Sequence, residues 1–149
     1  GKIFNLIKFK TMEDLKDSNE NLLEDSKRIT KIGGILRKYS IDELPEIINI
    51  ALGQMSFIGP RPLLVEYLPL YSQAQKKRHD VKPGLTGLAQ VNGRNLLTWE
   101  EKFILDLEYV QNISLWNDVK ILFKTFFIVF NTYQVNQSSK ITMEKFKGS

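Results

Sequence analysis

The sequence has no cysteine among its 149 residues, and its only histidine is His79. Disulfide bonds, thiolate metal sites, cysteine nucleophiles and clusters of histidine ligands are therefore excluded. Walker-type loops and Gly-x-Gly-x-x-Gly loops are absent, as is the Gly-x-Ser-x-Gly element of serine hydrolases. Because His79 lies in a charged stretch, we interpret it as a solvated side chain and assign it no chemistry.

Long hydrophobic runs are also lacking. No apolar run approaches the ~20 residues that a membrane-spanning helix requires, and the first residues do not have the pattern of a signal peptide. We therefore expect any membrane contact of these residues to be superficial. A cytosolic setting is the default for such a chain.

Acidic residues are slightly outnumbered, with 17 Asp and Glu against 21 Lys and Arg and a net charge of +4. This bias suits an anionic partner such as nucleic acid, anionic lipid or a nucleotide sugar. The 26% charged and 42% apolar residues are typical of a globular protein rather than a disordered one. At this length the composition predicts a single compact unit.

Apolar periodicity divides the chain into a few expected elements. Lys2–Met12 alternates apolar and basic residues and is predicted to be extended, and the polar stretch after it is interpreted as a solvated loop with a helical turn. Helical periodicity then continues in two pieces to a stop at Gly53. The remaining predictions are a helical segment over 65–80, turns and short strands over 81–95, helices over 99–110 and 115–133, and a polar tail over 134–149.

The helix expected over 115–133 has one broad apolar face. Such a face is typical of a helix packed on a core, which the pattern alone favours, and it also suits a helix lying in a membrane interface. Both interpretations can hold for different parts of the face. Its residues are Leu115, Trp116, Val119, Leu122, Phe123, Phe126, Phe127, Phe130 and Tyr133.

Two adjacent carboxylates, Asp42 and Glu43, are the most suggestive chemical feature. Ser40 and Glu43 have the spacing of a capping box, which predicts a helix beginning near Ser40 with Asp42 in its first turn. The positive end of a helix keeps carboxylates ionised, and an ionised aspartate can attack phosphorus. Spacing alone favours the simpler alternative, in which both residues only satisfy the helix end.

A carboxylate that approaches a diphosphate meets like charge, so such chemistry requires cations. Arg61 and Arg94 lie in loops fixed by proline or glycine, where a guanidinium could bind phosphate in a bidentate manner. Each basic residue taken alone is more simply a surface charge. The candidates are Lys8, Lys10, Arg37, Lys38, Arg61 and Arg94.

Several long motifs then resemble, in order, the bacterial sugar transferase family of polyprenyl-phosphate phosphoglycosyl transferases. The resemblance extends from Lys2 to about Thr125. It rests on KFKTM from Lys8, LRKYSIDELP from Leu36, GQMSFIGPRP from Gly53 and PGLTGLAQVNGR from Pro83.

The resemblance implies a two-step reaction on a UDP-sugar. Asp42 would attack the β-phosphorus, release UMP and hold the phosphosugar until undecaprenyl phosphate takes it, while Glu43 would bind Mg²⁺. The resemblance further implies that basic residues contact phosphate or uridine and that two acidic residues orient them. The basic positions are Lys8, Arg37, Arg61 and Arg94, and the acidic positions are Asp106 and Asp118. A simpler interpretation of Asp106 and Asp118 is that each forms a surface ion pair.

The resemblance also implies a fold and a location. We expect a mixed α/β domain over residues 1–133, with helices around a small sheet and amphipathic helices at the cytoplasmic face of the bacterial inner membrane. Family members begin with an apolar re-entrant membrane helix that does not appear before Gly1, so the chain is expected to be truncated.

The donor is expected from likeness to members that start protein N-glycosylation, which implies UDP-N,N′-diacetylbacillosamine. The alternative within the family is transfer of galactose phosphate or glucose phosphate for capsule or O-antigen. A different class of function is a basic peripheral membrane-binding module without catalysis. The aromatic residues form no recognisable base-stacking motif, which counts against nucleic acid.

Overall fold

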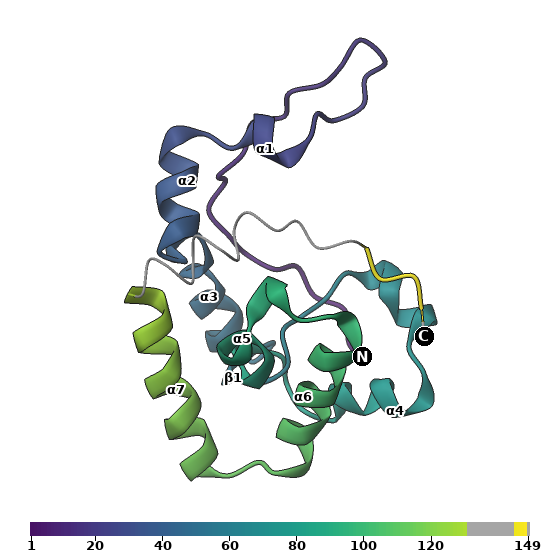
Figure 1. Cartoon of the computed structure of the whole chain (residues 1–149), viewed down its shortest axis with the longest axis vertical. Helices are drawn as coiled ribbons and strands as arrows, with labels where there is room; N and C mark the ends of the chain where they lie inside the picture. The colour runs from purple at the N-terminus through teal and green to yellow at the C-terminus, as the bar shows by residue number, and fades with distance from the viewer. Residues whose placement is uncertain (131–144, 149) are drawn as a thin grey trace.

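The computed structural model describes residues 1–130 and 145–148, and it consists mainly of helices around a two-stranded sheet (Figure 1). The prediction of a mixed α/β fold with helices around a small sheet is confirmed. The α-helices are α1 (Asp25–Arg28), α2 (Lys31–Lys38), α3 (Glu46–Ala51), α4 (Gln73–Lys76), α5 (Leu88–Asn92), α6 (Trp99–Gln111) and α7 (Leu115–Phe130). The strands are β1 (Ser56–Ile58) and β2 (Gly84–Thr86), and the 3-10 helices are η1 (Ile41–Glu43), η2 (Val65–Leu70), η3 (Lys77–Asp80) and η4 (Arg94–Leu96).

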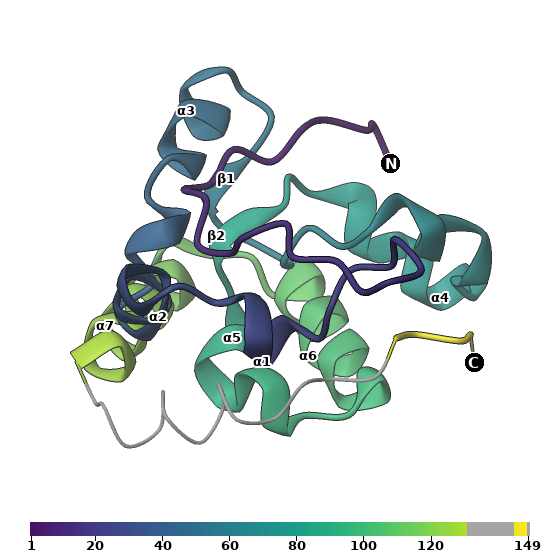
Figure 2. The same ribbon diagram turned by 90° about the horizontal axis from the view of Figure 1, so that it is seen from above.

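The sheet lies at the centre of the molecule, where β1 and β2 pair in parallel (Figure 2). Ile58 pairs with Thr86 in the register of the two strands. The strands approach closely, because a Cβ atom at Gly84 would lie 2.1 Å from the backbone nitrogen of Gly59. Helix α7 contacts both strands, and α5 packs against both α6 and α7. This arrangement fixes the loops that follow β1 and β2.

Two clusters of buried side chains form the core. The first joins the sheet to α5, α6 and α7 and consists of Ile58, Val91, Tyr109 and Ile121. The second lies between η2 and α6 and consists of Tyr67, Tyr71, Phe103 and Phe146. Phe146 therefore reaches the core from the segment that the sequence predicts as a polar tail. The rest of that segment, up to residue 144 together with Ser149, lies outside the described residues.

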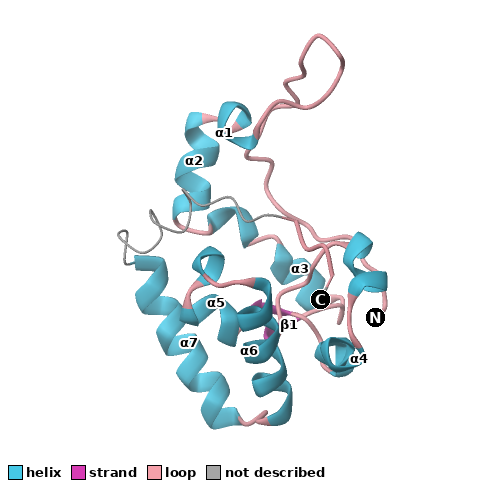
Figure 3. Cartoon of the chain, turned by 45° about the vertical axis from the view of Figure 1, so that its right-hand side comes forward, coloured by secondary structure: helices cyan, strands magenta, loops and turns pink. Residues whose placement is uncertain are grey.

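The N-terminal residues are extended, as predicted, but they form no regular strand. Instead they are held by isolated hydrogen bonds: the Ile7 amide donates to Asn49 Oδ1 at 3.0 Å, and the Phe9 amide donates to the Asp42 carbonyl at 3.0 Å. The polar stretch that follows projects as a loop beyond α1 (Figure 3). The predicted helical turn in this stretch corresponds to α1.

The predicted capping box at Ser40 is wrong. Ser40 adopts a left-handed conformation with φ of 55°, its side chain caps no helix, and η1 rather than an α-helix follows it. The Glu43 carboxylate instead binds the cations described below. The predicted stop at Gly53 is borne out by its φ of 71°, which favours glycine.

The helical segment predicted over 65–80 is divided into η2, α4 and η3. Pro69 lies inside η2 and has no amide hydrogen, which disfavours a continuous α-helix through this segment. A capping box between Ser72 and Gln75 then begins α4. The structure thus has the expected helical character here in three short pieces.

Helix α7 buries a different face from the one with the strongest apolar pattern. Ile121 is 3% exposed and Thr125 hydrogen-bonds Thr86 of β2 at 2.7 Å, so this side of α7 contacts the core. Trp116, Phe123 and Phe127 on the apolar face are exposed. The side chain of Phe130 and all of Tyr133 lie outside what the structure describes. Within the described part of the chain, no helix has the length and apolar character needed to cross a bilayer.

Candidate active site

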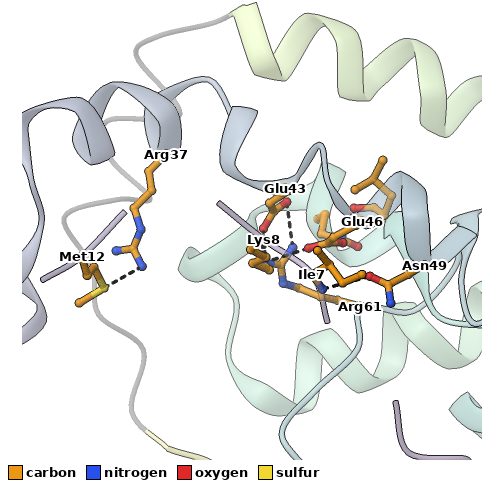
Figure 4. Close-up of polar contacts among 10 residues, drawn as sticks. Ile7, Lys8, Met12, Arg37, Glu43, Glu46, Asn49 and Arg61 are labelled. Atoms are coloured by element: carbon orange, nitrogen blue, oxygen red, sulfur yellow. Dashed lines mark hydrogen bonds and ion pairs between the residues drawn. The ribbon is translucent and has the colours of Figure 1, made fainter. Parts of the chain in front are cut away.

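Two carboxylates and two cations meet beside η1 and the start of α3 (Figure 4). Lys8 Nζ lies 2.9 Å from Glu43 Oε1 and 3.1 Å from Glu46 Oε1. Arg61 approaches Glu43 with both terminal nitrogens: Nη1 lies 3.4 Å from Oε2, and Nη2 donates to Oε1. We call Lys8, Glu43, Glu46 and Arg61 the ion-pair cluster. Its members come from three separate parts of the chain.

The Glu43 carboxylate is strongly stabilised in its charged form. Burial alone would raise its pKa, but Arg61 and then Lys8 lower the pKa through charge and hydrogen bonds to about 2. Glu43 is therefore ionised at neutral pH and is fully engaged by cations.

Asp42 has different surroundings from its neighbour. Within the described residues its carboxylate forms no ion pair, although its backbone carbonyl is bonded to Phe9. Burial raises the pKa of Asp42, the charge of Glu43 raises it further, and the charges of Lys8 and Arg37 oppose this effect. The two adjacent carboxylates thus differ in basicity and in availability, which is a pattern typical of catalytic pairs.

Lys8 is placed by the N-terminal segment, which Asn49 anchors to α3. Asn49 is fully buried, and its side chain accepts from the Ile7 amide and donates to the Asn5 carbonyl at 2.9 Å and to Gln54 Oε1 at 2.6 Å. Both the oxygen and the nitrogen of the Asn49 side-chain amide are therefore hydrogen-bonded. This anchoring directs the next residue, Lys8, toward the cluster.

Arg61 is placed by the loop after β1. Pro60 is fully buried, and the Arg61 carbonyl accepts a 2.7 Å hydrogen bond from Arg78 Nη2. The Arg61 side chain as a whole is 40% exposed. A bidentate guanidinium in this position matches the geometry of a phosphate group.

Arg94 belongs to the same electrostatic environment, although it forms no ion pair in the described part of the chain. It begins η4 with φ of 52°, directly after Gly93. Burial lowers the pKa of Arg94, the charge of Glu43 raises it, and the charge of Arg61 lowers it. Arg94 is thus a second partly buried guanidinium near Glu43 and Arg61.

The other three residues predicted for the site lie outside the ion-pair cluster. Arg37 extends away from it, and its Nη2 lies 3.2 Å from the Met12 sulfur (Figure 4). Asp106 binds Arg78 rather than a predicted base. Asp118 accepts a 2.9 Å hydrogen bond from the Tyr109 hydroxyl and joins α7 to α6. In the described part of the chain, the Asp118 carboxylate therefore contacts Tyr109 rather than an arginine, and Asp106 is linked to Arg61 through Arg78.

Glu46, Asn49 and Arg78 are components of the site that the sequence pattern did not single out. Glu43, Glu46 and Asn49 are spaced three residues apart, so they share one face of a helical stretch. This spacing is the sequence signal that could have identified Glu46 and Asn49. Arg78 lies in a run of basic residues that is typical of a solvated surface, yet it is only 4% exposed.

The acidic side chains can be tested for their fit to the expected Mg²⁺. The described residues contain no group of three or more acidic or histidine side chains arranged to hold a metal ion. A Mg²⁺ ion that binds with a nucleotide needs only one or two carboxylates, because phosphate and water supply its other oxygen ligands. Glu43 and Glu46 are two such carboxylates, and a metal ion would replace Lys8 or Arg61, which contact them here. The residues therefore fit a metal ion held jointly with a diphosphate, not a cage made by protein alone.

Comparisons with known proteins agree over nearly the whole chain. Residues 1–132 match the family model described as bacterial sugar transferase. The chain is 52% identical over 149 residues to the uncharacterized sugar transferase EpsL of Bacillus subtilis (strain 168), covering 100% of this chain and 74% of EpsL.

Two further relatives have names that state a reaction. The undecaprenyl-phosphate galactose phosphotransferase of Salmonella typhimurium is 39% identical over 142 residues, covering 84% of this chain and 30% of that protein. The UDP-glucose:undecaprenyl-phosphate glucose-1-phosphate transferase of Escherichia coli (strain K12) is 39% identical over 137 residues, covering 85% of this chain and 30% of that protein. The chain thus spans less than a third of the length of these two relatives.

Proposed function

Because the chain belongs to the bacterial sugar transferase family, we propose that it transfers a sugar 1-phosphate from a UDP-sugar to undecaprenyl phosphate. The observation that carries this proposal is the difference between the two adjacent carboxylates. Within the described residues the Asp42 carboxylate forms no ion pair, and it lies beside Glu43, whose partner Arg61 can bind an anionic substrate. A nucleophile next to phosphate-binding cations is the arrangement that phosphosugar transfer needs.

In the first step a carboxylate oxygen of Asp42 attacks the β-phosphorus of the donor. A bond forms between this oxygen and phosphorus, the bond between phosphorus and the bridging oxygen breaks, and UMP leaves with that oxygen. In the second step a phosphate oxygen of the acceptor attacks the same phosphorus and displaces Asp42. The products are UMP and a lipid diphosphate sugar, and the Asp42 carboxylate is regenerated.

The cations offset the repulsion between Asp42 and the donor. At 4 Å each pair of like unit charges repels by about 4 kcal/mol at an effective dielectric constant of 20, so an uncompensated approach would be slow. Arg61 and Arg94 are proposed to bind the phosphates, and Lys8 holds Glu43 and Glu46 in place. Mg²⁺ bound by Glu43 and the diphosphate would neutralise charge on the leaving UMP.

Arg37 and Asp118 are proposed to act on the site indirectly. The charge of Arg37 lowers the pKa of Asp42, so Arg37 acts on the nucleophile electrostatically, without contact to the cluster. Asp118 is proposed to act by holding α6 and α7 together beneath the site.

For the donor, we propose a UDP-hexose, galactose or glucose, as the first choice. The names of the Salmonella and Escherichia coli relatives support this choice slightly over UDP-N,N′-diacetylbacillosamine. The pathway would accordingly be polysaccharide assembly rather than protein N-glycosylation.

The acceptor implies a membrane, and we propose that the protein works at the cytoplasmic face of the bacterial inner membrane. Exposed Trp116, Phe123 and Phe127 form an apolar face on α7, with Lys120 and Lys124 on the same helix. An apolar face with adjacent lysines suits the surface of an anionic bilayer. No nucleic-acid partner is proposed.

The decisive experiment is intact-protein mass spectrometry after incubation with Mg²⁺ and one UDP-sugar at a time, without acceptor. UDP-galactose, UDP-glucose and UDP-N,N′-diacetylbacillosamine are compared. We expect a covalent phosphosugar on the parent protein and on the matched control Asp14→Asn, whose carboxylate is exposed and paired with Lys10. Asp42→Asn should show no adduct while keeping its fold.

The outcome also separates the alternatives. An adduct on Asp42→Asn would remove Asp42 as the nucleophile. If no donor labels the parent, and the protein binds anionic vesicles equally well with and without Asp42→Asn, a membrane-binding module without catalysis becomes the better interpretation.

A further inference from the structure

Arg78 is a buried cation that the proposed reaction does not use. Its Nε and Nη2 atoms lie 3.0 and 2.8 Å from Asp106 Oδ2, and Nη2 also donates to the Arg61 carbonyl at 2.7 Å. Arg78 and Asp106 are each about 4% exposed. A buried ion pair is weak evidence for stability, because the desolvation of both charges offsets their attraction. Its contact with Arg61 suggests a different purpose.

Aromatic rings surround the Arg78 guanidinium. Its central carbon lies 5.9 Å from the centroid of the Tyr71 ring and 5.8 Å from that of Phe103. These contacts hold the planar guanidinium in one orientation and keep water away from it. The position of the Arg61 backbone therefore depends on the packing of Tyr71 and Phe103.

Phe146 covers these two rings. It is 5% exposed, and its ring centroid lies 5.1 Å from that of Phe103 and 6.0 Å from that of Tyr71. A chain of direct contacts thus leads from Phe146 through Tyr71 and Phe103 to Arg78, and from there to the backbone of Arg61. Phe146 also packs on Tyr67 of η2, with 5.8 Å between the ring centroids, and Figure 1 shows the C-terminal segment that contains Phe146 in yellow.

We propose that Phe146 is a positioning residue for Arg61: it seals the Arg78–Asp106 ion pair from water and thereby fixes the loop that carries the phosphate-binding guanidinium. This inference rests on the proposed function for the role of Arg61. Without Phe146, water reaches the pair, weakens the attraction between the two charges and gives the Arg78 guanidinium other partners than the Arg61 carbonyl.

The test compares Phe146→Ala with the parent in steady-state transfer from the UDP-sugar, at a temperature where thermal unfolding shows both proteins folded. We expect kcat/KM to fall by roughly tenfold to a hundredfold, because a small displacement of a positioning group has effects of this size. Phe146→Leu should restore most of the rate, since it refills the pocket with apolar atoms. Lys147→Ala, an exposed neighbour, is the matched control and should behave like the parent.

Hydrogen exchange gives a readout that does not depend on activity. The backbone amides of Gly59, Arg61, Leu63 and Leu64 should exchange faster in Phe146→Ala than in the parent and Lys147→Ala. If the parent transfers no phosphosugar from any UDP-sugar, the proposed function fails, and the exchange result still decides whether Phe146 positions the loop. Parent-like exchange in the folded Phe146→Ala protein would overturn the inference.

A second variant covers the case in which Phe146→Ala does not fold. Arg78→Lys keeps the charge beside Asp106 but lacks the fork that reaches both Asp106 and the Arg61 carbonyl. It should reproduce the faster exchange of the same backbone amides and the loss in kcat/KM. Unchanged exchange and kcat/KM in Arg78→Lys would contradict the inference equally.

Discussion

At the residue scale, Asp42 and Glu43 are neighbours whose roles are separated by what each carboxylate contacts. Glu43 binds Arg61 and Lys8, whereas Asp42 forms no ion pair in the described structure. A carboxylate with a raised pKa is the more basic of the two and therefore the better nucleophile, provided that it is ionised at working pH. The cations hold the pKa of Glu43 low, whereas burial and the charge of Glu43 outweigh the cations at Asp42 and raise its pKa.

The lowered pKa of Glu43 predicts a loss of stability in acid. Its folded pKa is about 2, against 4.5 without the interactions, so its contribution is fully present above about pH 4.5 and is lost as pH falls toward 2. The full contribution is on the order of 3 kcal/mol. Urea unfolding measured from pH 7 to pH 2.5 should show this loss in the parent.

Glu43→Gln is the comparison for this prediction. Its unfolding free energy should be lower than the parent's at pH 7 and should change less between pH 4.5 and 2.5. The raised pKa values of Asp42 and Glu46 make the unfolding free energy rise as pH falls through the same range, which opposes the effect of Glu43. The quantity to compare is therefore the difference in unfolding free energy between the parent and Glu43→Gln at each pH. If the unfolding free energies of the two proteins change with pH in parallel, Glu43 does not cause the loss of stability in acid.

Some residues of the site could be found from sequence and others could not. Asp42, Glu43 and Arg61 lie in recognisable motifs, and the structure brings Glu43 and Arg61 into contact. Arg78 could not be found, because a basic residue among Lys76, Lys77 and His79 has the pattern of a surface, and only the tertiary packing buries it. The interpretation of His79 as solvated is wrong: its ring lies 5.5 Å from that of Tyr71, and burial lowers its pKa. Within the described residues its buried Nε2 atom has no hydrogen-bond partner.

At the element scale, Asn49 of α3 forms the two side-chain hydrogen bonds that anchor the backbone of the N-terminal segment at Asn5 and Ile7. Asn49→Ala removes three hydrogen bonds, including those to the backbone of Asn5 and Ile7. Since each bond contributes about 1 kcal/mol and buried groups are left unsatisfied, we expect a loss of about 2–4 kcal/mol in unfolding free energy. The amides of Ile7 and Lys8 should also exchange faster.

The matched control for this variant is Asn21→Ala, in the exposed loop before α1. It should change unfolding free energy by less than about 0.5 kcal/mol, as is usual for surface positions. Asn49→Ala with parent-like exchange at Ile7 would mean that other contacts hold the segment.

Long periodic elements were predicted better than short ones. The helices expected over 99–110 and from residue 115 correspond closely to α6 and α7, because each has several turns of consistent pattern. The short 3-10 helices could not be distinguished from turns or α-helix by periodicity. At Ser40 the capping pattern was overridden because Glu43 gains more from Arg61 and Lys8 than from a helix end.

At the scale of the whole molecule, α7 combines a buried side with an outward apolar face. Replacing Phe123 and Phe127 with serine should reduce binding to vesicles that contain anionic lipid by roughly tenfold or more, because each ring contributes about 1.5–3 kcal/mol when buried. Co-flotation with vesicles of defined composition measures the effect. The fold should be retained, since both side chains are more than 60% exposed.

Ile104→Ser on α6 is the control for this prediction, because Ile104 is 64% exposed on another helix. It should bind vesicles like the parent. Equal losses in both proteins would indicate general apolar adhesion, and no loss in the α7 variant would place the bilayer contact elsewhere.

The parallel pairing of β1 and β2 also governs when, during folding, the charges of the site become balanced. Parallel strands require a crossover connection, here residues 59–83, whereas isolated helices form within microseconds. Arg61 follows β1 closely and Arg94 lies beyond β2, while Asp42, Glu43 and Glu46 belong to one short helical stretch. A chain with formed helices but unpaired strands therefore holds three neighbouring carboxylates before both guanidinium groups have arrived. Mutual repulsion makes that order of events unfavourable, so strand pairing and the completion of the carboxylate cluster should occur in one cooperative step.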